Sequence, residues 1–108
     1  MEPENLQIRM IVKEHINGGR LLIAICDKDL IDKKFSEGNM QLDLSSTFYK
    51  GEEVEEEKLQ EMIKKAFMIN AVGKKAVGFL EKEGLIDKEN IIKIKGIPHA
   101  QYMLLSEF

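Results

Sequence analysis

The stretch that decides the fold occupies residues 17–26 and reads Asn17-Gly18-Gly19-Arg20-Leu21-Leu22-Ile23-Ala24-Ile25-Cys26. Asparagine and glycine tolerate positive φ, so the first four residues predict a tight hairpin turn. The next six positions are all apolar, which is typical of a central strand covered on both faces of a sheet. The chain is therefore expected to be built around a buried strand at 21–26, paired with the segment before the turn.

Further strands are expected on both sides of this stretch. Apolar and other residues alternate at 7–15 and again at 40–45, a period that indicates half-exposed strands. Residues 91–95 and 101–105 also predict strands, while 30–35 is ambiguous and fits one helical turn. Residues 45–51 are expected to form a loop that carries two aromatic side chains.

Two helices are expected in the second half of the chain. The first begins near residue 54 and has an apolar stripe at helical spacing, made of Leu59, Met62, Ile63, Ala66 and Phe67. The second runs from about residue 72 to residue 83, and Gly84 fits the left-handed position that closes a helix. Strands followed by helices and further strands predict an α+β fold, a two-layer sandwich with a mostly antiparallel sheet and two main helices on one face.

Length and composition limit the classes of protein. With 108 residues and 44% hydrophobic content, the chain is expected to be a single domain spanning residues 1–108, with a flexible N-terminus at 1–6. The net charge of −3 hides six glutamates and one lysine at 52–61, so the other residues sum to +2. Cys26 is the only cysteine and lies in an apolar run, where we expect a buried side chain. No run is long enough to cross a bilayer, and a cytoplasmic protein is expected.

The first candidate site is the segment Asn70-Ala71-Val72-Gly73-Lys74-Lys75, at the expected start of the second helix. Free amide groups and partial positive charge at a helix start attract phosphates. Asn70 would cap the helix, Gly73 would let a ligand approach the backbone, and the two lysines would add charge. The competing interpretation is an ordinary capped helix with a solvated lysine pair.

The second candidate is Gly96-Ile97-Pro98-His99-Ala100-Gln101, expected to be a stiff, shaped loop between two strands. His99 would bind phosphate when charged, stack on a base, or act as a general acid or base. The alternative is a structural histidine that holds a turn. We predict that His99 and the segment 70–73 lie close together in space, because both are shaped and polar.

The third candidate combines lysines and aromatic residues at 33–35 and 48–50, a pattern suited to single-stranded RNA. Lys33 would contact phosphates, and Tyr49 would be exposed for stacking, whereas Phe35 and Phe48 are expected in the core. Two histidines without paired cysteines argue against a zinc site, and we expect neither a metal nor a cofactor.

Several of these motifs together resemble the archaeal domain-of-unknown-function 424 family. They are Cys26-Asp27, Leu30 with Lys33 and Phe35, Phe48-Tyr49-Lys50-Gly51-Glu52, Asn70 with Val72-Gly73, Ala76-Val77, and residues 96–101 ending in Pro98-His99-Ala100-Gln101. The resemblance implies a small cytoplasmic α/β protein with an RNA-binding role linked with translation. Asp32 replaces an expected glycine, and Lys74 stands where an acidic residue is common.

Three functions remain open at this point. The favoured one is binding of RNA or a ribonucleoprotein surface through the region around Gly73, His99 and Lys33. The second is an enzyme that acts on a phosphorylated or nucleotide substrate, with His99 as general acid or base. The third is a protein-interaction subunit that uses the acidic helix. The sequence determines neither a reaction nor the oligomeric state.

Overall fold

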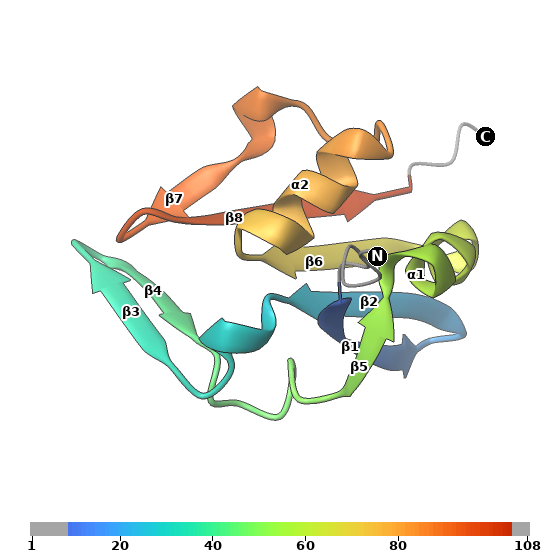
Figure 1. Ribbon diagram of the computed structural model, residues 1–108, viewed down its shortest axis with the longest axis horizontal. Coiled ribbons are helices and arrows are strands. Elements are labelled where there is room, and N and C mark those ends of the chain that lie inside the picture. The colour runs from blue at the N-terminus through green and yellow to red at the C-terminus, as the bar shows by residue number, and fades with distance from the viewer. Residues whose placement is uncertain (1–8, 105–108) are drawn as a thin grey trace, which may run out of the picture.

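A computed structural model describes residues 9–104 and shows a mixed six-stranded sheet, a separate two-stranded sheet and two helices (Figure 1). The large sheet has the order β5-β1-β2-β6-β8-β7. Its strands are β1 (Arg9–Asn17), β2 (Arg20–Cys26), β5 (Glu52–Glu55), β6 (Met68–Val72), β7 (Ile92–Ile94) and β8 (Ile97–Met103). The small sheet pairs β3 (Lys34–Glu37) with β4 (Met40–Asp43), and the helices are α1 (Glu56–Met62) and α2 (Lys74–Lys82). The flexible N-terminus expected at 1–6 lies outside the described residues.

The centre of the fold agrees with the sequence prediction. Strands β1 and β2 form an antiparallel hairpin closed by Gly18 and Gly19, whose φ angles are 61° and 78°. Strand β2 then pairs in parallel with β6, while the other neighbouring pairs of the large sheet are antiparallel. The predicted α+β class, with a mostly antiparallel sheet, is confirmed.

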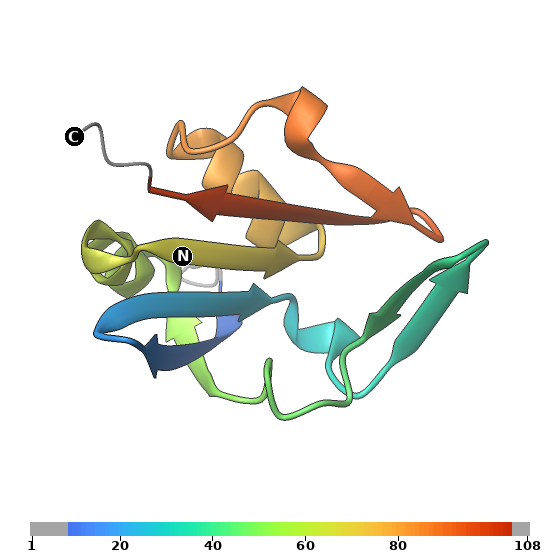
Figure 2. The same cartoon turned by 180° about the vertical axis from the view of Figure 1, so that it is seen from behind.

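The two faces of the sheet are covered differently. On one face, Ile23 and Ile25 of β2 pack with buried side chains of α1 and α2. On the other face, Ala24 and Cys26 pack with a smaller set that includes Leu42 of β4. This second face is turned to the viewer in Figure 2, where β6 and β8 lie in front of α2. The helices thus cover one face, as predicted, and the β3–β4 hairpin lies beside the other at one end.

The first helix is shorter than predicted, and its expected start is a strand. Residues Glu52–Glu55 form β5, in which Val54 lies opposite Met10 of β1 and is buried. The glutamates suited a helix start, but pairing along the free edge of β1 overrides that local preference. Helix α1 ends at Met62 and continues as a 3₁₀ turn, Ile63–Lys65. Phe67 therefore lies beyond the helix, with the Arg20 guanidinium 4.3 Å above its ring.

Two other predictions at the C-terminal half need correction. The segment expected to begin the second helix is strand β6, and α2 starts only at Lys74. The expected loop at 96–101 is mostly strand β8, and the turn is confined to Lys95 and Gly96, with φ angles of 55° and 78°. Pro98 suggested a loop, yet the pairing of β8 with both β6 and β7 decides its conformation.

Two smaller features complete the architecture. Gly84 has a φ of 77°, and the N–H groups of Gly84 and Leu85 donate to the carbonyls of Glu81 and Leu80. These two bonds are the Schellman motif, so the predicted cap is confirmed. In the ambiguous segment 30–35, Leu30 ends a 3₁₀ turn, Lys28–Leu30, residues 31–33 form a connection, and β3 begins at Lys34.

Candidate functional site

Three polar side chains meet on the sheet face opposite the helices. Asn70 of β6 lies opposite Gln101 of β8, and Val72 lies opposite His99. The Nε2 atom of His99 is 3.0 Å from Oδ1 of Asn70, and Nε2 of Gln101 donates to the same oxygen over 3.3 Å. The prediction that His99 lies close to the segment 70–73 is confirmed. Adjacent strands, rather than two loops, bring these residues together.

The hydrogen bonds fix the chemistry of this cluster, which we name the Asn70–His99–Gln101 cluster. Because an amide oxygen only accepts, His99 donates its Nε2–H and keeps Nδ1 as an acceptor. Burial lowers the pKa of His99 below its usual value, so the ring is neutral near pH 7. The cluster therefore offers amide donors and imidazole and amide acceptors without net charge. A neutral ring does not attract phosphate by charge, which favours hydrogen bonding over the phosphate role expected for His99.

The surroundings of the cluster are flat and partly apolar. Leu22, Met68 and Met103 form the neighbouring row across β2, β6 and β8, and Met103 is 47% exposed. At the β1 end of this row, the His15 ring stacks on Phe48 with a centroid distance of 4.6 Å and an interplanar angle of 10°. Nε2 of His15 also lies 2.9 Å from the Phe48 carbonyl oxygen, which holds the stack in place. Polar and apolar groups thus share one open sheet face.

The start of α2 is occupied by a carboxylate from within the chain. Asp27, which is 6% exposed, accepts hydrogen bonds from the backbone N–H groups of Lys75 at 3.0 Å and Ala76 at 2.8 Å. A Cβ atom at Gly73 would lie 2.2 Å from Cγ of Asp27, so glycine leaves room for this carboxylate. The expectation that Asn70 caps the helix is therefore wrong, because Gly73 stands at the N-cap. Two of the helix-start N–H groups that would meet a phosphate already donate to Asp27.

Sequence reasoning missed Asp27, although one signal was present. An acidic residue directly after a fully apolar strand is placed at the strand's end, where its carboxylate must find donors. The exposed residues Lys74 and Lys75 begin α2, which packs on the sheet face opposite His99. The structure thus joins the two predicted segments through Gly73 N–H, which donates to the Pro98 carbonyl at 2.9 Å, and through the Asn70 side chain. The side chains of Lys74 and Lys75 are not part of this contact.

The third predicted group is divided by burial. Lys33 is exposed between the 3₁₀ turn and β3, and it remains available to a ligand. Tyr49, expected to be exposed, is buried with Leu44 and Cys26, and burial raises the pKa of its hydroxyl to about 12. Phe35 and Phe48, expected in the core, are both half-buried and pack against the margin of the cluster that contains Tyr49.

An enzyme needs a second reactive group beside His99. Its side-chain hydrogen-bond partner among the described residues is the neutral amide of Asn70. Cys26 was expected to be buried and is, and burial raises the pKa of its thiol to about 12, which suppresses nucleophilic thiolate. Within residues 9–104 no group of three or more His, Cys, Asp or Glu side chains is arranged to hold a metal ion.

The acidic run is largely neutralised within the chain. Four of its six glutamates form ion pairs: Glu53 with Lys28, Glu55 with Arg9, Glu56 with Lys82 and Glu61 with Lys64. These contacts favour the interpretation of the run as a solvated surface over that of a partner site.

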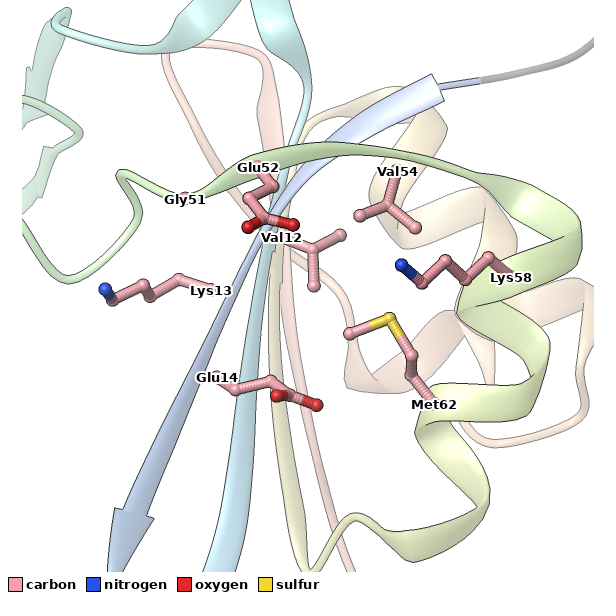
Figure 3. Close-up of a pocket in the computed structure, with 8 residues that line it drawn as sticks. All are labelled: Val12, Lys13, Glu14, Gly51, Glu52, Val54, Lys58 and Met62. Carbon is pink, nitrogen blue, oxygen red and sulfur yellow. The ribbon is translucent and has the colours of Figure 1, made fainter.

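A hollow of about 410 Å³ lies between β1, β5 and α1 (Figure 3). Glu14 and Lys58 extend toward the space that Met62 lines, whereas Lys13 extends from the opposite side of β1. With the Lys13 side chain turned away, the charged side chains of the hollow are those of Glu14, Glu52 and Lys58, which give no excess of positive charge to attract an anionic ligand. In the described part of the chain, no helix has the length and apolar character needed to span a membrane.

Comparison with known proteins gives a consistent assignment. The model of a family described as a protein of unknown function, DUF424, matches residues 14–105. A crystal structure of an uncharacterized conserved protein from the archaeon Methanopyrus kandleri is similar, with a TM-score of 0.74 and 26% sequence identity. The match covers 93% of this chain and 96% of that one. A comparison with curated proteins gives no match.

Proposed function

The chain belongs to the DUF424 family, and from this premise and the open sheet face we propose that it binds single-stranded RNA. The observation that carries the proposal is the neutral, hydrogen-bonded Asn70–His99–Gln101 cluster on the face that the helices leave uncovered. RNA of the translation machinery is the target that the family resemblance implies.

The chemistry of this face suits exposed bases. Proteins recognise unpaired RNA bases by hydrogen bonds to their edges and by stacking on flat side chains. The cluster provides donors and acceptors for base edges, and the stacked pair of His15 and Phe48 provides a planar group on the same side of the sheet. Met68 and Met103 supply polarizable apolar surface in the row next to the cluster.

Positive charge on this face is limited, which sets the expected salt dependence. Lys13 is exposed and lies in the same cross-strand row as Asn70 and Gln101, and Lys33 is exposed near the β3–β4 hairpin. With two to four lysines engaged, the log-log slope of affinity against salt is expected to be about −1.5 to −3. A much steeper slope would require more phosphate contacts than the lysines of this face provide.

The test is binding of a labelled single-stranded oligouridylate and of a transfer RNA pool across a salt series. We expect Asn70→Ala and Gln101→Ala to weaken binding, because each removes base-edge contacts. Lys13→Ala should flatten the slope by about 0.7, the value for one phosphate contact on a single strand. Lys65→Ala is the matched control, since Lys65 is exposed beside α1.

Two results would refute the proposal. The first is absence of binding at micromolar protein in low salt. The second is equal RNA affinity of the wild type and of the Asn70→Ala and Gln101→Ala variants, which would mean that RNA binds to another surface. Crosslinking in archaeal cells followed by sequencing of the bound RNA would then identify the target independently.

A further inference from the structure

A groove of about 600 Å³ lies between α2 and the β7–β8 hairpin, on the helix-covered side of the sheet. It is separate from the Asn70–His99–Gln101 cluster, which faces the other side. The lining residues come from α2, from the turn before β7 and from the β7–β8 hairpin, and Figure 1 shows where these elements lie, with β7 in orange.

The charge of the groove is positive and is not neutralised within the described part of the chain. Lys74, Lys88 and Lys93 are all exposed, and none of them forms an ion pair there. Glu81, half-buried on α2, is the one acidic residue of the lining. Between the lysines, the half-buried Ile91 contributes apolar surface, and the buried Val77 and Pro98 lie at the bottom of the groove. An occupant would therefore have both acidic and apolar groups.

Gly78 is the second observation that points to an occupant. Glycine in a helix interior is less favourable than alanine, because it loses more backbone freedom on folding. A Cβ atom at Gly78 would meet no atom within 4 Å, so the fold itself does not require glycine there. The missing side chain instead keeps the groove wall bare, as a closely approaching ligand backbone requires.

We propose that this groove binds an extended acidic peptide segment of a partner protein. Lysines at its rim complement acidic side chains, and the apolar floor and Gly78 accept the peptide's backbone and apolar side chains. Nucleic acid fits less well, since no aromatic or arginine side chain lines the groove for stacking. The acidic run of a second copy also fits less well, because its glutamates at 53, 55, 56 and 61 are already paired.

The experiment titrates the ¹⁵N-labelled full-length protein with a peptide of alternating glutamate and leucine, about six residues or about 20 Å long when extended. The acidic peptide is expected to shift the amide signals of Val77, Gly78 and Lys93, whereas a peptide of alternating lysine and leucine is not. Lys93→Glu should weaken binding about tenfold or more through like-charge repulsion. Lys65→Glu, outside the groove, should leave it unchanged.

Gly78→Ala separates binding from folding. It should raise the melting temperature by about 4 °C, because alanine is the better helix former, and should weaken peptide binding about tenfold. The proposal is overturned if the acidic peptide causes no shifts up to about 1 mM, a concentration that would reveal even weak binding. It is also overturned if Gly78→Ala binds as tightly as the wild type, or if oligouridylate shifts the groove amides and the peptide does not.

Discussion

Replacing Asp27 by alanine tests the most specific structural claim, that this carboxylate holds the start of α2. The carboxylate is 6% exposed and accepts from two backbone N–H groups, at 2.8 Å and 3.0 Å. A hydrogen bond to a charged group contributes about 1.5–3 kcal/mol when one partner is removed. Ala76 is fully buried, so loss of the hydrogen bond from its N–H costs the full stabilisation. Lys75 is exposed, so water can replace the carboxylate at its N–H and the cost there is smaller. The expected loss in unfolding free energy is about 3–4 kcal/mol.

Gly73→Ala extends this prediction to a double-mutant cycle. With Asp27 present, the substitution has two costs. The new Cβ would lie 2.2 Å from Cγ of Asp27, and the alanine would have to adopt the φ of 110° that Gly73 has. In the Asp27→Ala background the clash is absent, and only backbone strain of about 1–3 kcal/mol remains. The two substitutions should therefore be coupled by about 1–3 kcal/mol, with the double variant less destabilised than the sum.

The assay is urea unfolding followed by far-ultraviolet circular dichroism, since the chain has no tryptophan. Asp27→Ala also frees helix-start amides, so phosphate should stabilise this variant relative to chloride at equal ionic strength. The wild type, whose amides are occupied, should show no such difference. A loss below about 1 kcal/mol, or additive costs in the cycle, would refute the role assigned to Asp27.

Four further outcomes are expected. Gly84→Ala should cost about 1 kcal/mol, because alanine resists the φ of 77°, and an unchanged melting temperature would reject the cap. Lys95→Asn should stabilise the β7–β8 turn by about 0.5 kcal/mol, since asparagine adopts positive φ more readily, as a higher urea midpoint would show. Ile63→Ala should cost about 1–2 kcal/mol, because Ile63 is half-buried against the helix-side core; a cost near zero in the same assay would place it outside that core. The pKa of His99 is lower in the folded state, so its contribution to stability is complete above about pH 6.5 and declines as pH falls below that value. Urea midpoints between pH 5 and 7.5 should fall less steeply in His99→Gln than in the wild type.

The candidate site shows where local signals were sufficient and where they failed. Glycines with a positive φ, which other residues rarely adopt, identified the β1–β2 turn and the Gly84 cap. Both features depend on only a few neighbouring dihedral angles. The proximity of His99 to the segment 70–73 was also predicted. The secondary structure of residues 96–101 was predicted wrongly. Pro98 favours a loop by its local preference, but β8 pairs with both β6 and β7, and this pairing determines the conformation.

The sequence by itself determined the buried β2 strand, its hairpin with β1, the α+β class and the burial of Cys26. These follow from hydrophobic periodicity and turn chemistry, which act over a few residues. Only the tertiary structure decided that β6 lies beside β2, that β5 forms at the edge of β1, that Tyr49 is buried and that Asp27 caps α2. The donors to Asp27 lie 48 and 49 residues away in the sequence. Contacts over that separation depend on strand order, which no local pattern specifies, because pairing energy is realised only after the intervening chain has folded back.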